Sequence, residues 1–160
     1  MEKEILQILE NNAHTTFEQI SAIIGTPVTE VTKYIEQAEK DRIILKYKAI
    51  INWDKVQNEH VCALIEVRLS PQKDVGFDSI AERIYRYPQT RTVYLISGTR
   101  DLFVLVTGRT NHEIADFVSQ KLSHIEGVLG TTTQFVLKRY KEDGEIIEEK
   151  EEVKRQPVIL

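Results

Sequence analysis

Hydrophobic residues recur at helical spacing in three short groups within residues 1–50, which predicts three short helices. The first helix covers 2–12, and its apolar residues are Ile5, Leu6, Ile8 and Leu9. A capping box of Thr15 and Glu18 predicts the start of the second helix, and Gly25 ends it. The apolar face expected for this second helix consists of Phe17, Ile20, Ile23 and Ile24.

A third helix is predicted from Thr26 as its cap, with Pro27 at the first position and an end near Asp41. Its apolar stripe is Val28, Val31, Ile35 and Ala38. Because each stripe is too small to stabilise a helix alone, the three helices are expected to pack together. A glycine turn between the second and third helices gives the layout of a helix-turn-helix, whose last helix can enter the major groove of DNA.

The third helix also has a polar face, which supplies candidate contacts to double-stranded DNA. The candidates are Thr26, Thr29, Thr32, Lys33, Gln37, Lys40 and Arg42. Lysine side chains suit phosphates, and Gln37 suits an adenine edge. Glutamates on the same helix oppose DNA: Glu30, Glu36 and Glu39. A trihelical packing or dimerisation module therefore stands as the alternative.

Residues 43–51 are rich in β-branched and apolar side chains, which predicts a strand beside the helices, as in a winged helix. Residues 51–60 are more polar and are interpreted as a linker. The first domain is therefore expected to be a winged-helix-like helix-turn-helix over 1–50.

Residues 61–142 repeat strand and helix patterns in a recognisable order. Alternating apolar residues predict strands over 61–69 and 128–138. Two helical patterns, which begin at Phe77 and at a Thr110–Glu113 capping box, flank a hairpin whose loop is 97–101. The order β-α-β-β-α-β predicts a four-stranded antiparallel sheet with both helices on one face, the ferredoxin-like arrangement. The chain as a whole is thus expected to be α+β.

Two helices can cover only one face of such a sheet. The hairpin strand over 102–106 is apolar on both faces, with Leu102, Val104 and Val106 on one and Phe103 and Leu105 on the other. The uncovered face should therefore be buried against a second copy of the chain, which predicts a homodimer at least. Residues 143–160 form a charged tail that is either solvated or reaches a neighbouring subunit.

Composition narrows the class of protein. The chain has 160 residues, of which 41% are hydrophobic and 29% charged, as in a soluble globular protein. It contains no apolar run long enough to cross a membrane and no signal-peptide pattern at its start. The single cysteine, Cys62, cannot form an internal disulfide and is interpreted as a small packed residue. These features favour the cytoplasm and no membrane partner.

The charge of residues 1–60 counts against DNA binding, and the positions of the histidines count against a metal site. Residues 1–60 hold seven Lys and Arg but ten Asp and Glu, an acidic balance that counts against DNA binding. No pair among the histidines, which are His14, His60, His112 and His124, has the spacing of metal ligands. No catalytic residue, metal or cofactor is predicted.

Residues 1–142 resemble the Lrp/AsnC family of transcription regulators, also called feast/famine regulators. The matching stretches are Gly25-Thr26-Pro27 with Val31 and Ile35, Arg42-Ile43-Ile44 with Tyr47, Ala49 and Asn52, Leu95-Ile96-Ser97-Gly98-x-x-Asp101, and Gly127-Val128-x-x-Thr131-x-Thr133. The resemblance implies a DNA-binding domain joined to an amino-acid-sensing and oligomerisation domain over 61–142. It also implies dimers that pair through their sheets, and octamers of four dimers.

The same resemblance implies that an effector binds between dimers, near the Ser-Gly-x-x-Asp loop. The candidate contacts are Ser97, Gly98, Asp101, Thr131 and Thr133. Asp101 suits the ammonium of an amino acid, while backbone N–H groups near Gly98 suit its carboxylate. The alternative is that Asp101 caps its own loop and the two threonines only fill the sheet.

The predicted recognition helix departs from the family at Tyr34, where members commonly carry an arginine. This predicts weak DNA binding by one domain, for which a ring of many domains compensates by multivalency. Two alternatives stay open: a degenerate regulator that acts by co-assembly with a DNA-binding relative, and an enzyme resembling the haem-precursor decarboxylases of this fold. The basic groups for the enzyme would come from Arg83, Arg86, Arg91, Arg100 and Arg109, with His112 or His124.

Overall fold

The computed structural model describes residues 1–56, 60–70 and 76–147, which form two compact units. The first unit covers Met1–Ile51, and the second begins at Asn52. Each unit has its own hydrophobic core. Most of the predicted charged tail, residues 148–160, lies outside the described residues.

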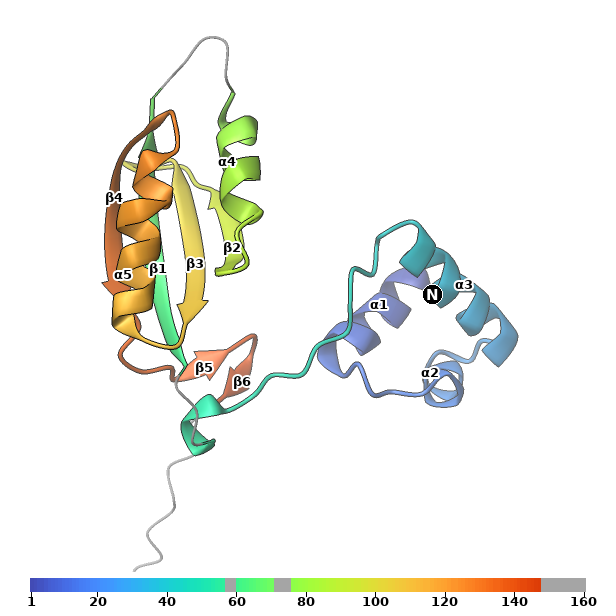
Figure 1. Ribbon diagram of the computed structural model, residues 1–160. Helices are drawn as coiled ribbons and strands as arrows, with labels where there is room; N and C mark the ends of the chain where they lie inside the picture. The colour runs from blue at the N-terminus through green and yellow to red at the C-terminus, as the bar shows by residue number, and fades with distance from the viewer. Residues whose placement is uncertain (57–59, 71–75, 148–160) are drawn as a thin grey trace, which may run out of the picture. The chain divides into compact units, whose positions relative to one another are not determined.

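The first unit consists of three helices, as the hydrophobic spacing predicts (Figure 1). They are α1 (Glu2–Asn11), α2 (Phe17–Ile24) and α3 (Val28–Lys40). Their small shared core consists of Ile5, Leu9, Ile20, Val31 and Ile35. The predicted inner face of α2 is wrong in part, because Phe17 is 36% and Ile23 65% exposed. A helix of two turns can direct only a narrow stripe toward a core of this size.

The capping residues of α2 and α3 differ from the prediction by one position. Thr16, not Thr15, caps α2, and it exchanges hydrogen bonds with Gln19 in a capping box. The hydroxyl of Thr15 is engaged elsewhere, since it donates to the carbonyl of Asn12 at 2.8 Å. At α3 the cap position belongs to Pro27, and no side chain caps the helix.

The predicted strand over 43–51 does not form, since these residues are assigned neither helix nor strand. The amides of Ile43 and Ile44 both donate to the carbonyl of Ala38 and so close the end of α3. A strand needs a second strand to pair its backbone groups, and the described residues of this unit supply none. Strand propensity alone was therefore insufficient here.

The second unit has the predicted β-α-β-β-α-β order. Its main elements are β1 (Val61–Leu69), α4 (Phe77–Tyr85), β2 (Thr90–Leu95), β3 (Leu102–Gly108), α5 (Asn111–Gln120) and β4 (Val128–Phe135), with a short helix η2 (Leu122–His124) after α5. The strands pair antiparallel in the order β2-β3-β1-β4, so the two central strands are β1 and β3. The ferredoxin-like sheet is confirmed.

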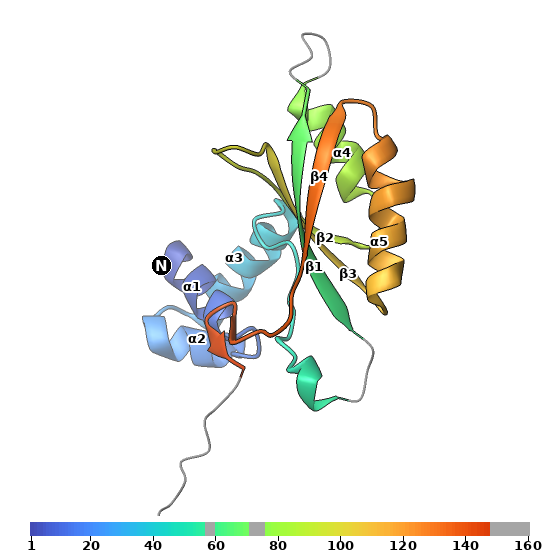
Figure 2. The ribbon, with the colours of Figure 1, turned by 90° about the vertical axis from the view of Figure 1, so that its left-hand side faces the viewer.

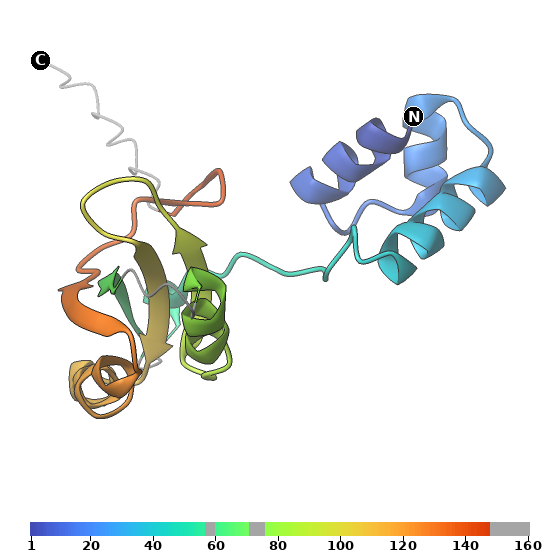
Figure 3. The same ribbon diagram turned by 90° about the horizontal axis from the view of Figure 1, so that it is seen from above.

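Both helices cover the same face of this sheet, as Figures 2 and 3 show. Side chains that alternate along β1 and β3 point to the helices and form the core. From the strands these are Ala63, Ile65, Val67, Leu69, Leu102, Val104 and Val106; from the helical segments they include Ile80, Ile84, Ile114, Phe117 and Leu122. The period of two in the sequence thus predicted the buried face correctly.

Short elements lie at the two ends of the second unit. The interpreted linker contains a turn of 3-10 helix, η1 (Trp53–Lys55). The interpreted tail starts inside a two-stranded hairpin formed by β5 (Lys141–Glu142) and β6 (Glu145–Ile146). The sequence pattern predicted neither η1 nor the β5–β6 hairpin, because both are too short to show a hydrophobic period.

Candidate functional site

The turn between α2 and α3 is built from three residues, Gly25, Thr26 and Pro27. Gly25 ends α2 with a φ of 68°, the left-handed conformation that favours glycine. The hydroxyl of Ser21 then donates to the carbonyl of Thr26 at 2.6 Å. These local bonds fix the start of α3 relative to α2, which is the geometry that a helix-turn-helix requires.

The polar face of α3 lies in solvent. Thr29, Lys33 and Lys40 are exposed, and so are Gln37 and Arg42, which lies one residue beyond the cap of the helix. Arg42 has a φ of 58°, so the chain turns sharply where α3 ends. The predicted DNA contacts from Thr29 to Arg42 therefore share one accessible helix and its end.

Three of the predicted contacts have local hydrogen bonds of their own. The hydroxyl of Thr32, which is half-buried, donates to the carbonyl of Val28 at 2.9 Å. Gln37 donates from Nε2 to Asp41 Oδ1 at 2.9 Å, so it must exchange this partner before it reads a base. Thr26 is half-buried, and its carbonyl is the one bound to Ser21.

The acidic side chains of α3 differ in their environment. Glu30 and Glu36 are exposed beside the candidate contacts, whereas Glu39 accepts a hydrogen bond of 2.9 Å from the hydroxyl of Tyr47. Desolvation, together with the bond to Glu39 and its charge, raises the pKa of Tyr47 to about 12. Tyr34, at the position of the family arginine, packs against the core and so presents no cation to DNA.

In the second unit, the predicted effector loop joins β2 to β3. Ser97 and Gly98 are exposed, and Gly98 takes a φ of 153°, with nothing within 4 Å of the place where a Cβ would lie. A ligand can therefore approach the backbone at this position. The structure places Ser97, Gly98 and Asp101 in one loop, as the sequence does.

Asp101 is engaged more deeply than either sequence interpretation expected. Its Oδ2 accepts from the backbone N–H of Leu69 at 2.7 Å, and its own N–H donates to the carbonyl of Val67 at 3.0 Å. The pairing of β1 with β4 shifts register between Arg68 and Leu69, so the carboxylate satisfies an amide at an irregularity of the sheet. Asp101 thus holds a neighbouring strand in addition to closing its own loop through the amide of Ile96.

The two candidate threonines lie away from this loop. Thr131 and Thr133 are half-buried in β4, opposite Val67 and Ile65, and so they share the helix-covered face. Since β1 lies between β3 and β4, about two strand spacings, or roughly 10 Å, separate these threonines from the β3 end of the loop. A ligand in contact with both groups of one chain must therefore extend across β1.

Arg100 is a residue that the site prediction missed. Its guanidinium lies 3.5 Å from Glu66 Oε2 and 3.4 Å from the hydroxyl of Thr132, and so it reaches across β1 to β4. The register pairs Glu66 with Thr132 on the face of the sheet that the helices leave uncovered. Arg100 and Thr132 are 32 positions apart, so no local pattern predicts their contact. The only signal in the sequence is the position of Arg100 beside Asp101 in the candidate loop.

The uncovered face of the sheet carries large apolar side chains. Tyr94 is 61% exposed, and Leu64, Phe103 and Leu105 are half-buried beside it in the sheet. A patch of this composition on a sheet is typical of a protein contact surface. It lies on the opposite side of the sheet from α4 and α5.

The described residues offer few groups for metal binding or for a cysteine nucleophile. Within them, no three His, Cys, Asp or Glu side chains gather closely enough to hold a metal ion. Burial, with a smaller effect from the charge of Glu142, raises the pKa of the Cys62 thiol, which makes it a poor nucleophile. Every described helix is too short or too polar to span a bilayer.

The sequence matches two family models that divide the chain as the fold does. Residues 1–44 match the winged helix-turn-helix DNA-binding model, and residues 62–146 match the Lrp/AsnC ligand binding domain. The relatives include YugG, an uncharacterised HTH-type transcriptional regulator of Bacillus subtilis, which is 45% identical over 155 residues. That alignment covers 96% of this chain and 93% of the relative.

Two further proteins show the breadth of the likeness. The HTH-type transcriptional regulator LrpA of Pyrococcus abyssi is 30% identical over 140 residues, which cover 88% of this chain and 96% of the relative. A solved complex of a transcriptional regulator from Neisseria meningitidis with L-Met superposes with a TM-score of 0.70 at 23% identity. That superposition covers 88% of this chain and 90% of the other, and it shows a shared fold.

Proposed function

Because this chain belongs to the Lrp/AsnC family of transcription regulators, we propose that α3 contacts DNA and that the loop 97–101 senses an amino acid. Every relative named above is a regulator, so the decarboxylase alternative is set aside. A regulator acts where chromosomal DNA is, which is why the cytoplasm is its proposed location.

The observation that carries the DNA-binding proposal is the exposed polar face of α3 after its glycine turn. Lys33 and Lys40 lie on this face and can each neutralise a phosphate, while Thr29 lies in the first turn, near base edges. Glu36 on the same face lowers the affinity of one domain, so tight binding needs several domains on one DNA.

A mobility-shift experiment with the upstream region of the protein's own gene tests this assignment. The wild-type protein should bind at micromolar concentration, and its affinity should fall as salt rises. Lys33→Ala and Lys40→Ala should each weaken binding, whereas Lys3→Ala on α1 removes the same charge from the same unit as the control. An equal loss in all three variants would contradict a specific role of α3.

The same mobility-shift experiment distinguishes DNA binding by the protein alone from the alternative of a regulator that acts by co-assembly. A protein that binds no DNA alone but shifts it when a family relative is added would be a regulator that acts by co-assembly. A clear footprint by the pure protein excludes that function. A trihelical packing module that never meets DNA would show no shift under either condition.

The effector proposal rests on the exposed backbone at Gly98 and on the carboxylate of Asp101. Backbone N–H groups beside Gly98 suit the carboxylate of an amino acid, and Asp101 has a second oxygen beside the one that Leu69 occupies. The L-Met complex of the Neisseria regulator supports an amino acid as the ligand class. Thr131 and Thr133 remain proposed contacts only for a ligand that spans the sheet edge.

Calorimetric titration with each of the twenty common amino acids tests the effector class. One or a few should bind, and Ser97→Ala should weaken that binding without changing the fold. Ser79→Ala on α4 serves as the matched control, because it removes a hydroxyl that makes only a local contact. Equal affinity of both variants would remove Ser97 from the site.

The assembly proposal is a homodimer through the uncovered face, with an octamer of four dimers as the larger state. Tyr94→Glu places a charge on that face and should dissociate the dimer, whereas Tyr85→Glu on α4 has similar exposure on the helix-covered side. Sedimentation or light scattering gives the mass of each variant. A Tyr94→Glu protein with wild-type mass would rule out this interface.

A further inference from the structure

The chain turns back on itself after the last strand of the sheet. The amide of Val136 donates to the carbonyl of Cys62, and a hairpin follows in which β5 pairs with β6. Asp143 and Gly144 have φ values of 45° and 91°, as in a two-residue hairpin turn. The amide of Ile147 closes the hairpin on the carbonyl of Tyr140. We call residues 140–147 the C-terminal hairpin.

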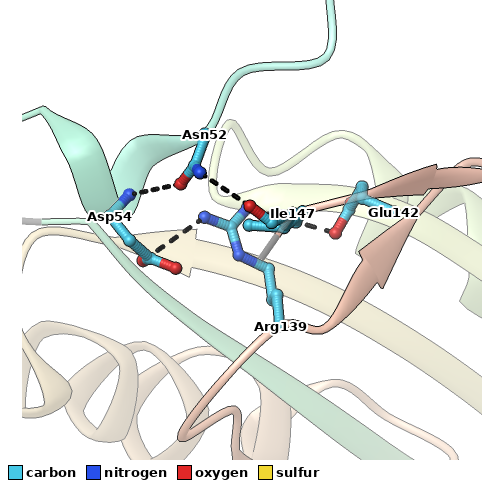
Figure 4. A network of polar contacts seen from close by, with 5 residues as sticks. All are labelled: Asn52, Asp54, Arg139, Glu142 and Ile147. Carbon is cyan, nitrogen blue, oxygen red and sulfur yellow. Dashed lines mark hydrogen bonds and ion pairs between the residues drawn. The ribbon is translucent and has the colours of Figure 1, made fainter. Parts of the chain in front are cut away.

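This hairpin is bonded to the first residue of the second unit. Asn52 donates from Nδ2 to the carbonyl of Ile147 at 3.0 Å, a contact between residues 95 positions apart (Figure 4). The Oδ1 atom of the same side chain accepts from the N–H of Asp54 at 3.2 Å and so caps η1. One amide side chain therefore joins η1 to the end of the C-terminal hairpin.

Arg139 adds a second connection at the same place. Its guanidinium lies 3.9 Å from Asp54 Oδ1 and 4.0 Å from Glu142 Oε2, between η1 and the hairpin (Figure 4). The Arg139 side chain is only 19% exposed, but Asp54 and Glu142 are 64% and 40% exposed, so each ion pair adds only a small contribution to this connection. The Trp53 ring of η1 also stacks on His60, with centroids 5.3 Å apart.

These contacts meet where the two units of the chain join, since the boundary lies between Ile51 and Asn52. We propose that the C-terminal hairpin is an anchor that fixes the point from which the chain leaves the second unit toward the DNA-binding unit. With the anchor closed, the tether begins at Ile51. With it open, the tether would begin at Val61, the first residue of β1, which adds up to about 30 Å of reach.

A fixed tether has a consequence for DNA binding by an assembly. The effective concentration of a second DNA-binding unit at its half-site depends on the length and freedom of the connection. A short, anchored tether accepts a narrow range of half-site spacings, and a longer one accepts many. The anchor thus sets spacing selectivity, a property beyond the contacts that α3 itself makes.

Tryptic digestion of the full-length protein tests the anchor without DNA. Lys55 lies in η1, whereas Lys46 and Lys48 lie in the first unit and report general accessibility. Asn52→Ala should speed cleavage at Lys55 about two- to tenfold relative to Lys46 and Lys48, because the bond to Ile147 no longer opposes opening. Arg139→Gln should act in the same direction.

Matched variants show whether loss of the bond to Ile147, and not a general change in the protein, causes the faster cleavage. Asn52→Asp keeps an acceptor for the N–H of Asp54 but loses the donor to Ile147, so it should behave as Asn52→Ala if the anchor matters. Asn111→Ala, at the exposed start of α5, and Arg86→Gln, at the exposed residue that follows α4, should leave all rates unchanged. An unchanged rate at Lys55 in both Asn52 variants, or an equal rise at all three lysines, would overturn the anchor.

A second experiment measures the consequence on DNA with two half-sites at increasing separation. Wild-type protein should prefer a narrow set of spacings, and Asn52→Asp should flatten that preference while its affinity for a single half-site stays the same. An identical spacing profile would overturn the role in selectivity. Loss of binding by wild-type protein itself would instead count against the proposed function, and the digestion result would still decide the anchor.

Discussion

The two units present their candidate functional residues in opposite ways. On α3, Lys33, Lys40 and Thr29 project into solvent from a regular helix. In the loop of the second unit, Asp101 and Arg100 already bind parts of the sheet that are distant in sequence. The interior of a helix pairs its own backbone groups, so Lys33, Lys40 and Thr29 are not needed to satisfy the backbone. A loop beside a sheet irregularity must use its side chains to satisfy backbone groups, so function and stability share the same atoms there.

The two units also differ in the size of their hydrophobic cores. Among the described residues, the hydrophobic cluster of the first unit has five buried members and that of the second has fourteen. A unit with few buried side chains has little stability to lose, so mutations should act more strongly in the first unit.

The largest expected effect is that of Ile35→Ala, which removes a side chain of 1% exposure from the smaller core. The cost of about 2–5 kcal/mol is comparable with the whole stability of so small a unit. The first unit should unfold and DNA binding should disappear, as seen by amide NMR spectra and mobility shift.

Ile80→Ala is its counterpart in the larger core, where the side chain is equally buried. It should lower the melting temperature of the second unit but leave that unit folded. If Ile35→Ala instead keeps native spectra and full DNA affinity, core size does not distinguish the units in the way proposed.

Asp101→Ala should have the next largest effect, because it leaves the N–H of Leu69 without its acceptor. A loss of about 1–3 kcal/mol is expected in chemical denaturation of the second unit. Asp101→Asn keeps a carbonyl acceptor and should recover most of this stability. Amino-acid binding by the Asn variant, measured by titration, then isolates the role of the charge. Unchanged binding would leave Asp101 with its structural role alone.

A smaller effect is expected from Tyr47→Phe in the first unit, which removes the hydrogen bond to Glu39 and should cost about 1 kcal/mol. The pKa of Tyr47 is raised to about 12, so the folded state favours the neutral phenol. Its contribution is therefore complete below pH 10, the ordinary value, and is lost as pH rises from 10 to about 12. Unfolding curves at pH 8 and pH 11 should differ more for wild type than for the Phe variant.

The smallest effect is expected from Glu36→Gln on the exposed face of α3. Removing one negative charge beside the DNA contacts should tighten binding about two- to threefold at low salt, an amount typical of a surface charge. Glu126→Gln in the second unit is also exposed and serves as the control. Equal changes in both variants would show that only the total charge matters.

Local pattern predicted the helices of the first unit and the strand order of the second. In a helix, side chains three to four residues apart share a face, and in a strand those two residues apart do. These spacings therefore predicted the buried faces of α3, β1 and β3. The prediction was wrong at 43–51, where strand-like residues lack a strand to pair with. It was also wrong at Thr15, whose hydroxyl bonds to Asn12 instead of capping α2.

The sequence by itself therefore determined the type and order of the elements, because helical and strand periodicity arise between near neighbours. It also placed Ser97, Gly98 and Asp101 in one loop. Only the tertiary structure decided that Asp101 binds Leu69, 32 residues away, and that Asn52 binds Ile147, 95 residues away. Such bonds form where the finished sheet brings an unpaired backbone group beside a polar side chain, and no local pattern encodes that meeting.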